Sequence, residues 1–527
     1  MLLSIFHRLI ACLLLICAAV QAHALTAEAA RAMAVGDTDE RIAALQQAIA
    51  TPDEATVAFI RAMADDAVKI AGDRAIVVRD EQGVDPVTGA PVAVPSEAED
   101  IVNNNRMRGE FDAALASLQL LSPDVAQRRA ALDALKEETD EARLPLIEKA
   151  LAAEHDADLK ARLESIRARM LLASGDAARR TEAAHYLAES GDPATRTALL
   201  EQLRQEQDPK ARAAMGAALK RVEDRLQWGE RLAALFSGIS LGSILLLVAL
   251  GLAITYGLMG VINMAHGELM MIGAYATFVM QGLFQKYFPG AFDWYLVAAV
   301  PVAFCASALM GAVLERGVIR FLYGRPLETL LATWGISLML QQLVRTVFGA
   351  QNVGVENPAW MSGGVQLMDN LQLPWNRLVI VAFAFAVLAG VAYLISRTRL
   401  GLFVRGVTQN RPIASCMGVN TARIDTYAFA LGSGIAGLAG CALSQVGNVG
   451  PDLGQSYIVD SFMVVVLGGV GQLAGTVYAA LGLGVLNKFL EGWTGAVLAK
   501  IAVLVFIIIF IQKRPQGIFA VKGRTAD

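Results

Sequence analysis

The distribution of apolar residues divides the chain into two parts. Between residues 25 and 230, apolar residues recur at spacings of three and four among charged ones, and Ala, Leu, Glu, Arg and Gln dominate. This pattern is typical of amphipathic helices. From residue 232 onward, long apolar runs alternate with short polar connections, as membrane-spanning helices do. The pattern predicts an all-α chain, with a charge-rich helical part followed by a polytopic membrane part.

The first residues predict a targeting signal. His7 and Arg8 precede an apolar stretch from Leu9 to Val20, and residues 22–24 (Ala-His-Ala) match an AxA-type cleavage site. We therefore expect residues 1–24 to be a signal peptide, with a retained signal anchor as the alternative. Residues 25–230 are then exported to the periplasm.

A repeat with a period of 52 residues is visible in this exported part. Residues 122–124 (Ser-Pro-Asp) and 174–176 (Ser-Gly-Asp) open similar stretches, and Leu135 and Ile147 correspond to Leu187 and Leu199. Each copy is expected to form two helices with turns, which predicts a helical-repeat domain of the HEAT-like kind. Residues 85–95 contain three Pro and one Gly and are expected to form an exposed loop.

The membrane part, residues 231–511, contains eight apolar stretches. They cover residues 236–258, 261–283, 295–318, 328–349, 375–396, 425–447, 460–490 and 497–511.

The connections between these stretches predict the orientation. Basic residues gather around residues 316–325, in 397–423 and in the tail, 512–527, and the positive-inside rule places all three in the cytoplasm. With residues 25–230 outside, the count of crossings is consistent only if residues 460–490 cross twice or form a re-entrant hairpin. Glycines between 467 and 475 favour such a break.

Composition excludes several classes of function. Residues 1–231 carry 28 basic and 38 acidic side chains and the remainder carries 17 and 11, so the chain lacks the basic soluble domain of a nucleic-acid binder. Five Cys and five His show no ligand spacing, and there is no phosphate-binding loop or nucleophile elbow. We expect neither a metal, a cofactor nor an enzymatic activity.

Two groups of residues are candidates for a translocation path. Asn263, His266 and Glu268 are polar residues at the junction of the first two spans, where they either cap a helix at a cytoplasmic turn or act near a conduit. Gly468, Gly469 and Gly471 lie in the predicted break. Further glycines in the spans allow either close helix packing or a smooth conduit; these are Gly432, Gly434, Gly437, Gly440, Gly482 and Gly484.

Four segments carry a resemblance to a known family. They are GLMGVINMAHGELMMIGAYATF (257–278), YGRPLETLLATWGISLMLQQ (323–342), TRLGLFVRGVTQNRPIASCMGVNTARID (398–425) and LGGVGQLAGT (467–476). With these motifs the chain resembles the permease subunits of branched-chain amino-acid ABC importers. The exported extension and the segments 444–466 and 487–519 resemble the urea-type permeases within that group. Leu402 and Gln409 depart from the amino-acid-type permeases, which usually carry Arg and an acid there.

The resemblance implies a role and a set of partners. It implies an inner-membrane importer subunit for a small polar solute such as urea, working with a second permease, two cytoplasmic ATPase subunits and a periplasmic binding protein. The acidic exported part suits a protein partner such as the binding protein. A branched-chain amino-acid or short-amide permease, and a passive channel or ion-coupled carrier, remain alternatives. The segment that the resemblance assigns to ATPase coupling includes Arg399, Gly401, Arg405, Asn410, Ala414, Gly418 and Asn420.

Overall fold

A computed structural model describes residues 25–519 except 51–52, 80–81, 96, 136–142 and 261. The predicted signal peptide, residues 1–24, and the end of the tail, 520–527, lie outside the described residues. The described chain forms two compact units that meet at Leu226 and Gln227. They are called here the N-terminal unit and the membrane unit, and the long helix α11 (Pro209–Met259) contains the boundary between them.

The first half of the N-terminal unit is a mixed helix and sheet structure. Four helices pack around one apolar core; they are α2 (Ala27–Ala34), α3 (Thr38–Ala50), α4 (Glu54–Ala64) and α5 (Asn105–Gln119). Between α4 and α5 the chain forms an antiparallel sheet in the order β4-β3-β2-β1-β5. Its strands are β1 (Val68–Ala71), β2 (Arg74–Arg79), β3 (Gln82–Val84), β4 (Pro91–Val92) and β5 (Glu99–Asp100).

The all-α prediction is wrong for this sheet. Val68 pairs with Val77 and Ala71 with Arg74, so β1 and β2 are joined by a two-residue loop. Gly72, the first residue of that loop, has a φ of +61°, which a tight hairpin requires and a side chain disfavours. Val68 of β1 and Ala75 and Val77 of β2 are buried in the apolar core that the four helices share. Residues 85–95 are mostly exposed, as expected, but contribute the short edge strand β4.

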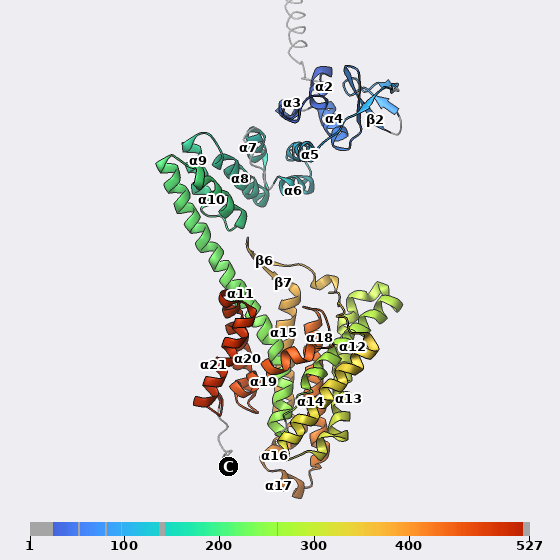
Figure 1. The fold of residues 1–527 in the computed structure, drawn as a ribbon, viewed down its shortest axis with the longest axis vertical. Helices are drawn as coiled ribbons and strands as arrows, with labels where there is room; N and C mark the ends of the chain where they lie inside the picture. Colours follow the sequence, from blue (N-terminus) through green and yellow to red (C-terminus); the bar gives the residue numbers. More distant parts are fainter. Residues whose placement is uncertain are drawn as a thin grey trace, which may run out of the picture. The chain divides into compact units, whose positions relative to one another are not determined.

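The second half of the N-terminal unit is built from short helices (Figure 1). They are α6 (Val125–Ala134), α7 (Leu144–Ala153), α8 (Ala157–Leu172), α9 (Ala177–Leu187) and α10 (Pro193–Gln205), followed by the first turns of α11. Each 52-residue period therefore holds three helices, whereas the sequence pattern predicted two. The third helix begins where Asp156 accepts hydrogen bonds from the N–H groups of residues 158 and 159, and Asp208 does the same for residues 210 and 211.

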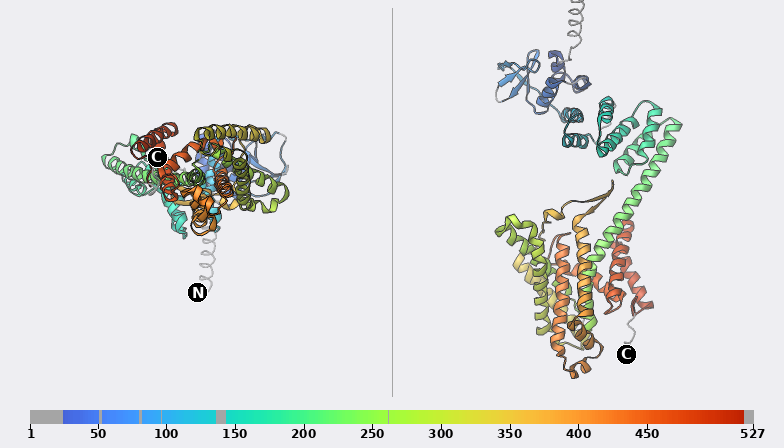
Figure 2. Two further views of the ribbon diagram at one scale, coloured as in Figure 1. Left: turned by 90° about the horizontal axis from the view of Figure 1, so that it is seen from below. Right: turned by 180° about the vertical axis from the view of Figure 1, so that it is seen from behind.

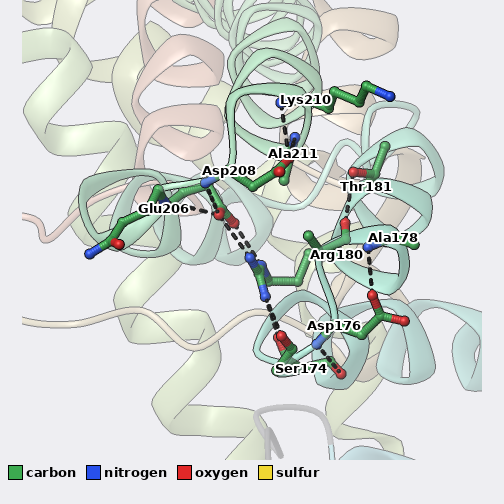
Figure 3. Close-up of polar contacts among 12 residues, drawn as sticks. Ser174, Asp176, Ala178, Arg180, Thr181, Glu206, Asp208, Lys210 and Ala211 are labelled. Atoms are coloured by element: carbon green, nitrogen blue, oxygen red, sulfur yellow. Dashed lines mark hydrogen bonds and ion pairs between the residues drawn. The ribbon is translucent and has the colours of Figure 1, made fainter.

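The same polar network recurs in both periods. Arg180 donates to both carboxylate oxygens of Glu206, at 2.6 and 2.8 Å, and to the carbonyl oxygens of Ser174 and Gly175 (Figure 3). Fifty-two residues earlier, Arg128 makes the equivalent bonds to Glu154 and to the carbonyls of residues 122 and 123. Arg180 lowers the pKa of Glu206 to about 2, and Arg128 lowers that of Glu154. Each network links the first turn of one helix to the residue that ends the next helix, α6 to α7 in the first period and α9 to α10 in the second.

The membrane unit consists of the remaining part of α11 and ten further α-helices among the described residues. They are α12 (His266–Tyr287), α13 (Tyr295–Gly317), α14 (Pro326–Phe348), α15 (Trp375–Arg397), α16 (Arg399–Gln409), α17 (Arg411–Cys416), α18 (Thr421–Ser444), α19 (Leu453–Gly468), α20 (Leu473–Thr494) and α21 (Ala496–Lys513). A hairpin of β6 (Gly364–Met368) and β7 (Leu371–Pro374) lies at one end of this unit, and α16 and α17 lie at the other (Figures 1 and 2).

Six described helical segments are long and apolar enough to cross a membrane: Pro209–Gly257, Pro289–Phe321, Trp375–Arg397, Thr421–Ser444, Leu473–Thr494 and Ala496–Lys513. The expected spans 261–283 and 328–349 correspond to α12 and α14, which are outside this set and carry buried polar residues. The expected break in 460–490 is confirmed, because residues 469–472 separate α19 from α20. Gly469 and Gly471 make this turn with φ angles of +99° and +80°.

Glycines bring the helices of the membrane unit into close backbone contact. A Cβ atom on Gly440 of α18 would lie 1.9 Å from the carbonyl oxygen of Met270 in α12, and one on Gly437 would lie 2.5 Å from the carbonyl oxygen of Ala303 in α13. Gly432 faces α11 in the same way, and Gly484 of α20 also faces α11. Gly482 has open space around it. Of the six span glycines that the sequence singled out, all except Gly482 therefore serve close helix packing.

Candidate functional site

The connection between α11 and α12 turns back into the helix bundle. His266, in the first turn of α12, donates from Nε2 to the carbonyl oxygen of Val248 at 3.2 Å. Val248 lies 11 residues before the end of α11 at Met259, which is about 16 Å along a helix axis. Residues 263 and 265–268 are therefore buried inside the bundle and do not form a turn at its surface.

Three polar residues of α14 face this buried segment. Thr333 accepts a hydrogen bond from the N–H of Met264 at 3.2 Å. Ser337 and Gln341 donate to Oε1 of Glu268 at 2.9 and 2.8 Å. The latter two lie near the middle of α14, so the carboxylate of Glu268 is placed at mid-bundle depth. We call Asn263, His266, Glu268, Thr333, Ser337 and Gln341 the mid-bundle polar cluster.

The cluster has unused hydrogen-bonding capacity. Asn263, His266 and Glu268 are 2%, 0% and 1% exposed, and Asn263 Nδ2, His266 Nδ1 and Glu268 Oε2 have no hydrogen-bond partner among the described residues. Buried polar atoms without partners are costly and uncommon. The three atoms combine an amide donor, a ring nitrogen and a carboxylate acceptor, so a small solute bearing N–H groups could complete them.

The predicted path glycines lie elsewhere and serve packing. Gly468 meets Gly475 of α20 at backbone contact distance, and a Cβ on Gly469 would lie 2.5 Å from the carbonyl oxygen of Phe519. A Cβ on Gly471 would lie 3.7 Å from the Cα of Gly257 near the end of α11. Among the described residues, the nearest neighbours of these three glycines do not include Asn263, His266 or Glu268.

The predicted coupling segment forms α16 and α17, which have one face in the core. Val404, Val407 and Ala414 are buried. Gly401 permits the sharp turn after α15, since a Cβ there would lie 2.1 Å from the carbonyl oxygen of Ile395. Gly418 ends α17 with a φ of +87°.

Two of the predicted coupling residues act as helix caps. The side chain of Asn410 accepts from the N–H of Ile413 at the start of α17, and that of Asn420 accepts from Arg423 at the start of α18. Helix caps of this kind fix where a helix begins.

The other face of α16 and α17 is exposed and partly apolar. Leu402 and Ile413 are each 60% exposed and Met417 is 79% exposed. Arg399 and Arg405 are exposed on the same segment. Apolar side chains interspersed with Arg are typical of protein–protein contact surfaces. We call Arg399, Leu402, Phe403, Arg405, Ile413 and Met417 the α16–α17 surface.

Sequence reasoning missed the α14 side of the polar cluster. Thr333, Ser337 and Gln341 follow one another at intervals of four in the largely apolar middle of this helix, which places them on one helical face. This polar face of the helix is the sequence feature from which the α14 side of the cluster could have been predicted. Among the described residues there is no group of three or more His, Cys, Asp or Glu side chains that could hold a metal ion.

Several apolar spans, a buried polar cluster at mid-depth and an exposed helix pair at one end define a multi-pass helical membrane protein. Residues 234–512 match the family described as "Branched-chain amino acid transport system / permease component", and the chain belongs to this family. It is therefore a permease subunit of an ABC importer of this family, and its homologues are transport subunits and not enzymes.

Individual relatives match the same part of the chain. The branched-chain amino acid permease BraD of Pseudomonas aeruginosa is 28% identical over 293 residues, covering 54% of this chain and 95% of its own. LivH of Escherichia coli K12 is 28% identical, covering 54% and 94%, and a probable LivH of Methanocaldococcus jannaschii is 24% identical, covering 56% and 93%. No solved structure gives a significant match.

Proposed function

We propose that this chain carries a small solute bearing N–H groups across the inner membrane, with urea as the preferred solute. The observation that carries this proposal is the mid-bundle polar cluster, in which Glu268 Oε2 is buried without a donor. The N–H groups of urea would satisfy that oxygen, and its carbonyl would accept from the side-chain amide of Asn263. The resemblance to urea-type permeases in residues 444–466 and 487–519 supports the same solute.

A branched-chain amino acid is the second candidate solute. The names of the relatives favour it, and the ammonium group of an amino acid also donates hydrogen bonds to a carboxylate. The two candidates differ in their apolar part, since an amino acid needs an apolar cavity for its side chain and urea does not.

We further infer that separate ATPase subunits bind the α16–α17 surface and drive alternating access. Exposed apolar residues together with Arg favour a protein partner there, and the positive-inside rule favours the cytoplasmic side. A second permease subunit and a periplasmic binding protein complete the importer. The acidic N-terminal unit, exported in this orientation, would assist capture of the binding protein or assembly, and the solute path would lie in the membrane unit.

Purification of the full-length chain from its native membranes tests this proposal. We expect ATPase subunits to co-purify, and liposomes containing the complex and its binding protein to accumulate labelled urea in the presence of ATP. Arg405→Glu should reduce the retained ATPase, because reversing a charge at an interface can cost about 2–5 kcal/mol. ATP-independent uptake of urea would support a passive channel instead.

The same vesicles test the solute site. Glu268→Gln should lower uptake about tenfold or more, because a charge-assisted hydrogen bond is lost, while ATPase retention stays unchanged. Glu328→Gln provides a matched control, since Glu328 lies on the same helix as Ser337 and Gln341 but is exposed and pairs with Arg325. Uptake of labelled leucine in place of urea would select the second candidate.

A further inference from the structure

Arg411 of the α16–α17 segment contacts two other elements, although 41% of its side chain remains exposed. The guanidinium of Arg411, the first residue of α17, forms an ion pair with Asp425 in the first turns of α18. The centre of the same guanidinium lies 4.8 Å from the centre of the Tyr323 ring, in the connection between α13 and α14. Arg411 thus joins three parts of the membrane unit that are distant in sequence.

The acceptor side of this contact is deeply buried. The side chain of Asp425 is 4% exposed. Its neighbour Thr426 donates to Oε2 of Glu315 at 2.7 Å, and Glu315 lies buried near the end of α13. Loss of the Arg411 guanidinium would leave Asp425 buried without its counter-charge, which is strongly unfavourable.

The other arginines of the segment are arranged differently. Arg399, Arg405 and Arg423 are exposed, and none of them forms an ion pair with another described residue. The chemistry of Arg411 also suits its position, because a planar guanidinium can stack on an aromatic ring while it donates to a carboxylate, and a lysine ammonium cannot reproduce both contacts.

We propose that Arg411 is a positioning residue that transmits movement of the α16–α17 surface to α18 and to the α13–α14 connection. This inference rests on the proposed function. The α16–α17 surface supplies the contact with the ATPase, and Arg411 fixes that surface on α18, which packs closely against α11, α12 and α13 through its glycines. Without Arg411, α17 could shift on α18. The ATP-driven movement of the α16–α17 surface would then not be transmitted to the mid-bundle polar cluster.

The test measures coupling separately from docking. The full-length chain is purified with its partner subunits and reconstituted with the binding protein, using labelled urea and labelled leucine as probes. The readouts are the ATPase retained and the number of solute molecules transported per ATP hydrolysed. Arg411→Gln should retain the ATPase but lower transport per ATP about tenfold, a typical size for a coupling between sites. Arg423→Gln, with the same charge change in the same basic segment, should leave both readouts unchanged.

Two further variants keep the inference falsifiable if Arg411→Gln fails to fold. Tyr323→Leu removes the stacking ring while the ion pair remains, and should lower transport per ATP by a smaller factor. The exchange of charges in Arg411→Asp with Asp425→Arg should restore part of the coupling. Unchanged transport per ATP in both Arg411→Gln and Tyr323→Leu would overturn the inference, as would loss of the ATPase itself from these variants. A wild-type chain that purifies without an ATPase would contradict the proposed function, and the inference with it.

Discussion

At the scale of single residues, buried charges in this chain have two distinct environments. Glu206 of the N-terminal unit is fully matched by Arg180 and by the backbone N–H groups of residues 207 and 208. Glu268 of the membrane unit accepts from Ser337 and Gln341 with one oxygen and leaves the other without a partner. A matched carboxylate stabilises a fold, whereas an unmatched one in a transport protein is suited to a ligand.

The matched carboxylate predicts a pH-dependent stability. The pKa of Glu206 is lowered from 4.5 to about 2 in the fold, so its contribution is complete above about pH 4.5 and is lost as the pH falls toward 2. Glu206→Gln should destabilise α9 and α10 by about 1.5–3 kcal/mol at pH 7, and the difference from wild type should shrink at low pH. Hydrogen exchange of these helices in the full-length protein measures the effect.

Glu201→Gln is the control for this prediction, because Glu201 lies exposed on α10. It should leave hydrogen exchange close to wild type at both pH values. Equal protection of α9 and α10 in the Glu206 and Glu201 variants at pH 7 would show that the Arg180–Glu206 pair does not stabilise the repeat.

At the scale of helices, α18 organises the membrane unit because its glycines remove side chains at successive contacts. Gly432 faces α11, Gly437 faces α13, and Gly440 faces α12. A helix with larger side chains at these positions could not approach three neighbours at backbone distance. The same principle brings Gly468 of α19 against Gly475 of α20 at the break between them.

This packing predicts opposite outcomes for two identical substitutions. Gly440→Ala places a Cβ 1.9 Å from the carbonyl oxygen of Met270 and should destabilise the membrane unit by about 1–3 kcal/mol. Gly482→Ala, in helix α20 with open space around it, should be neutral or slightly stabilising because Ala favours a helix. Each variant is heated in detergent, and size-exclusion chromatography then measures the fraction of protein that remains monodisperse. Equal thermal stability of the two variants would refute the close contact at Gly440.

At the scale of the whole molecule, charge predicts which side of the membrane each part occupies. Residues 1–231 carry the acidic excess and the remainder a basic one, and the basic residues of the membrane unit gather at its connections. The division of residues 453–494 into α19 and α20 is what this predicted orientation requires, because the stretch must cross twice or form a re-entrant hairpin to place the basic segments on one side.

Reporter fusions test this orientation. A reporter fused after Thr408 or at the C-terminus should be active only as a cytoplasmic reporter, because both sites lie in basic segments. A reporter inserted at Gly191 should be active only as an exported one. An exported C-terminus would mean that α19 and α20 together cross the membrane an odd number of times.

The sequence by itself determined the division into a charge-rich and an apolar part, the break near Gly469, the 52-residue period and the family resemblance, because each depends on composition, spacing or motifs along the chain. Tertiary structure decided the sheet of residues 68–100, where a two-residue turn and cross-strand pairing overrode the surrounding helical pattern. It also decided the roles of individual residues. Glu268 meets Ser337 and Gln341, and Arg411 meets Asp425 and Tyr323, only because helices distant in sequence pack together, and periodicity within one helix carries no information about which neighbour it faces.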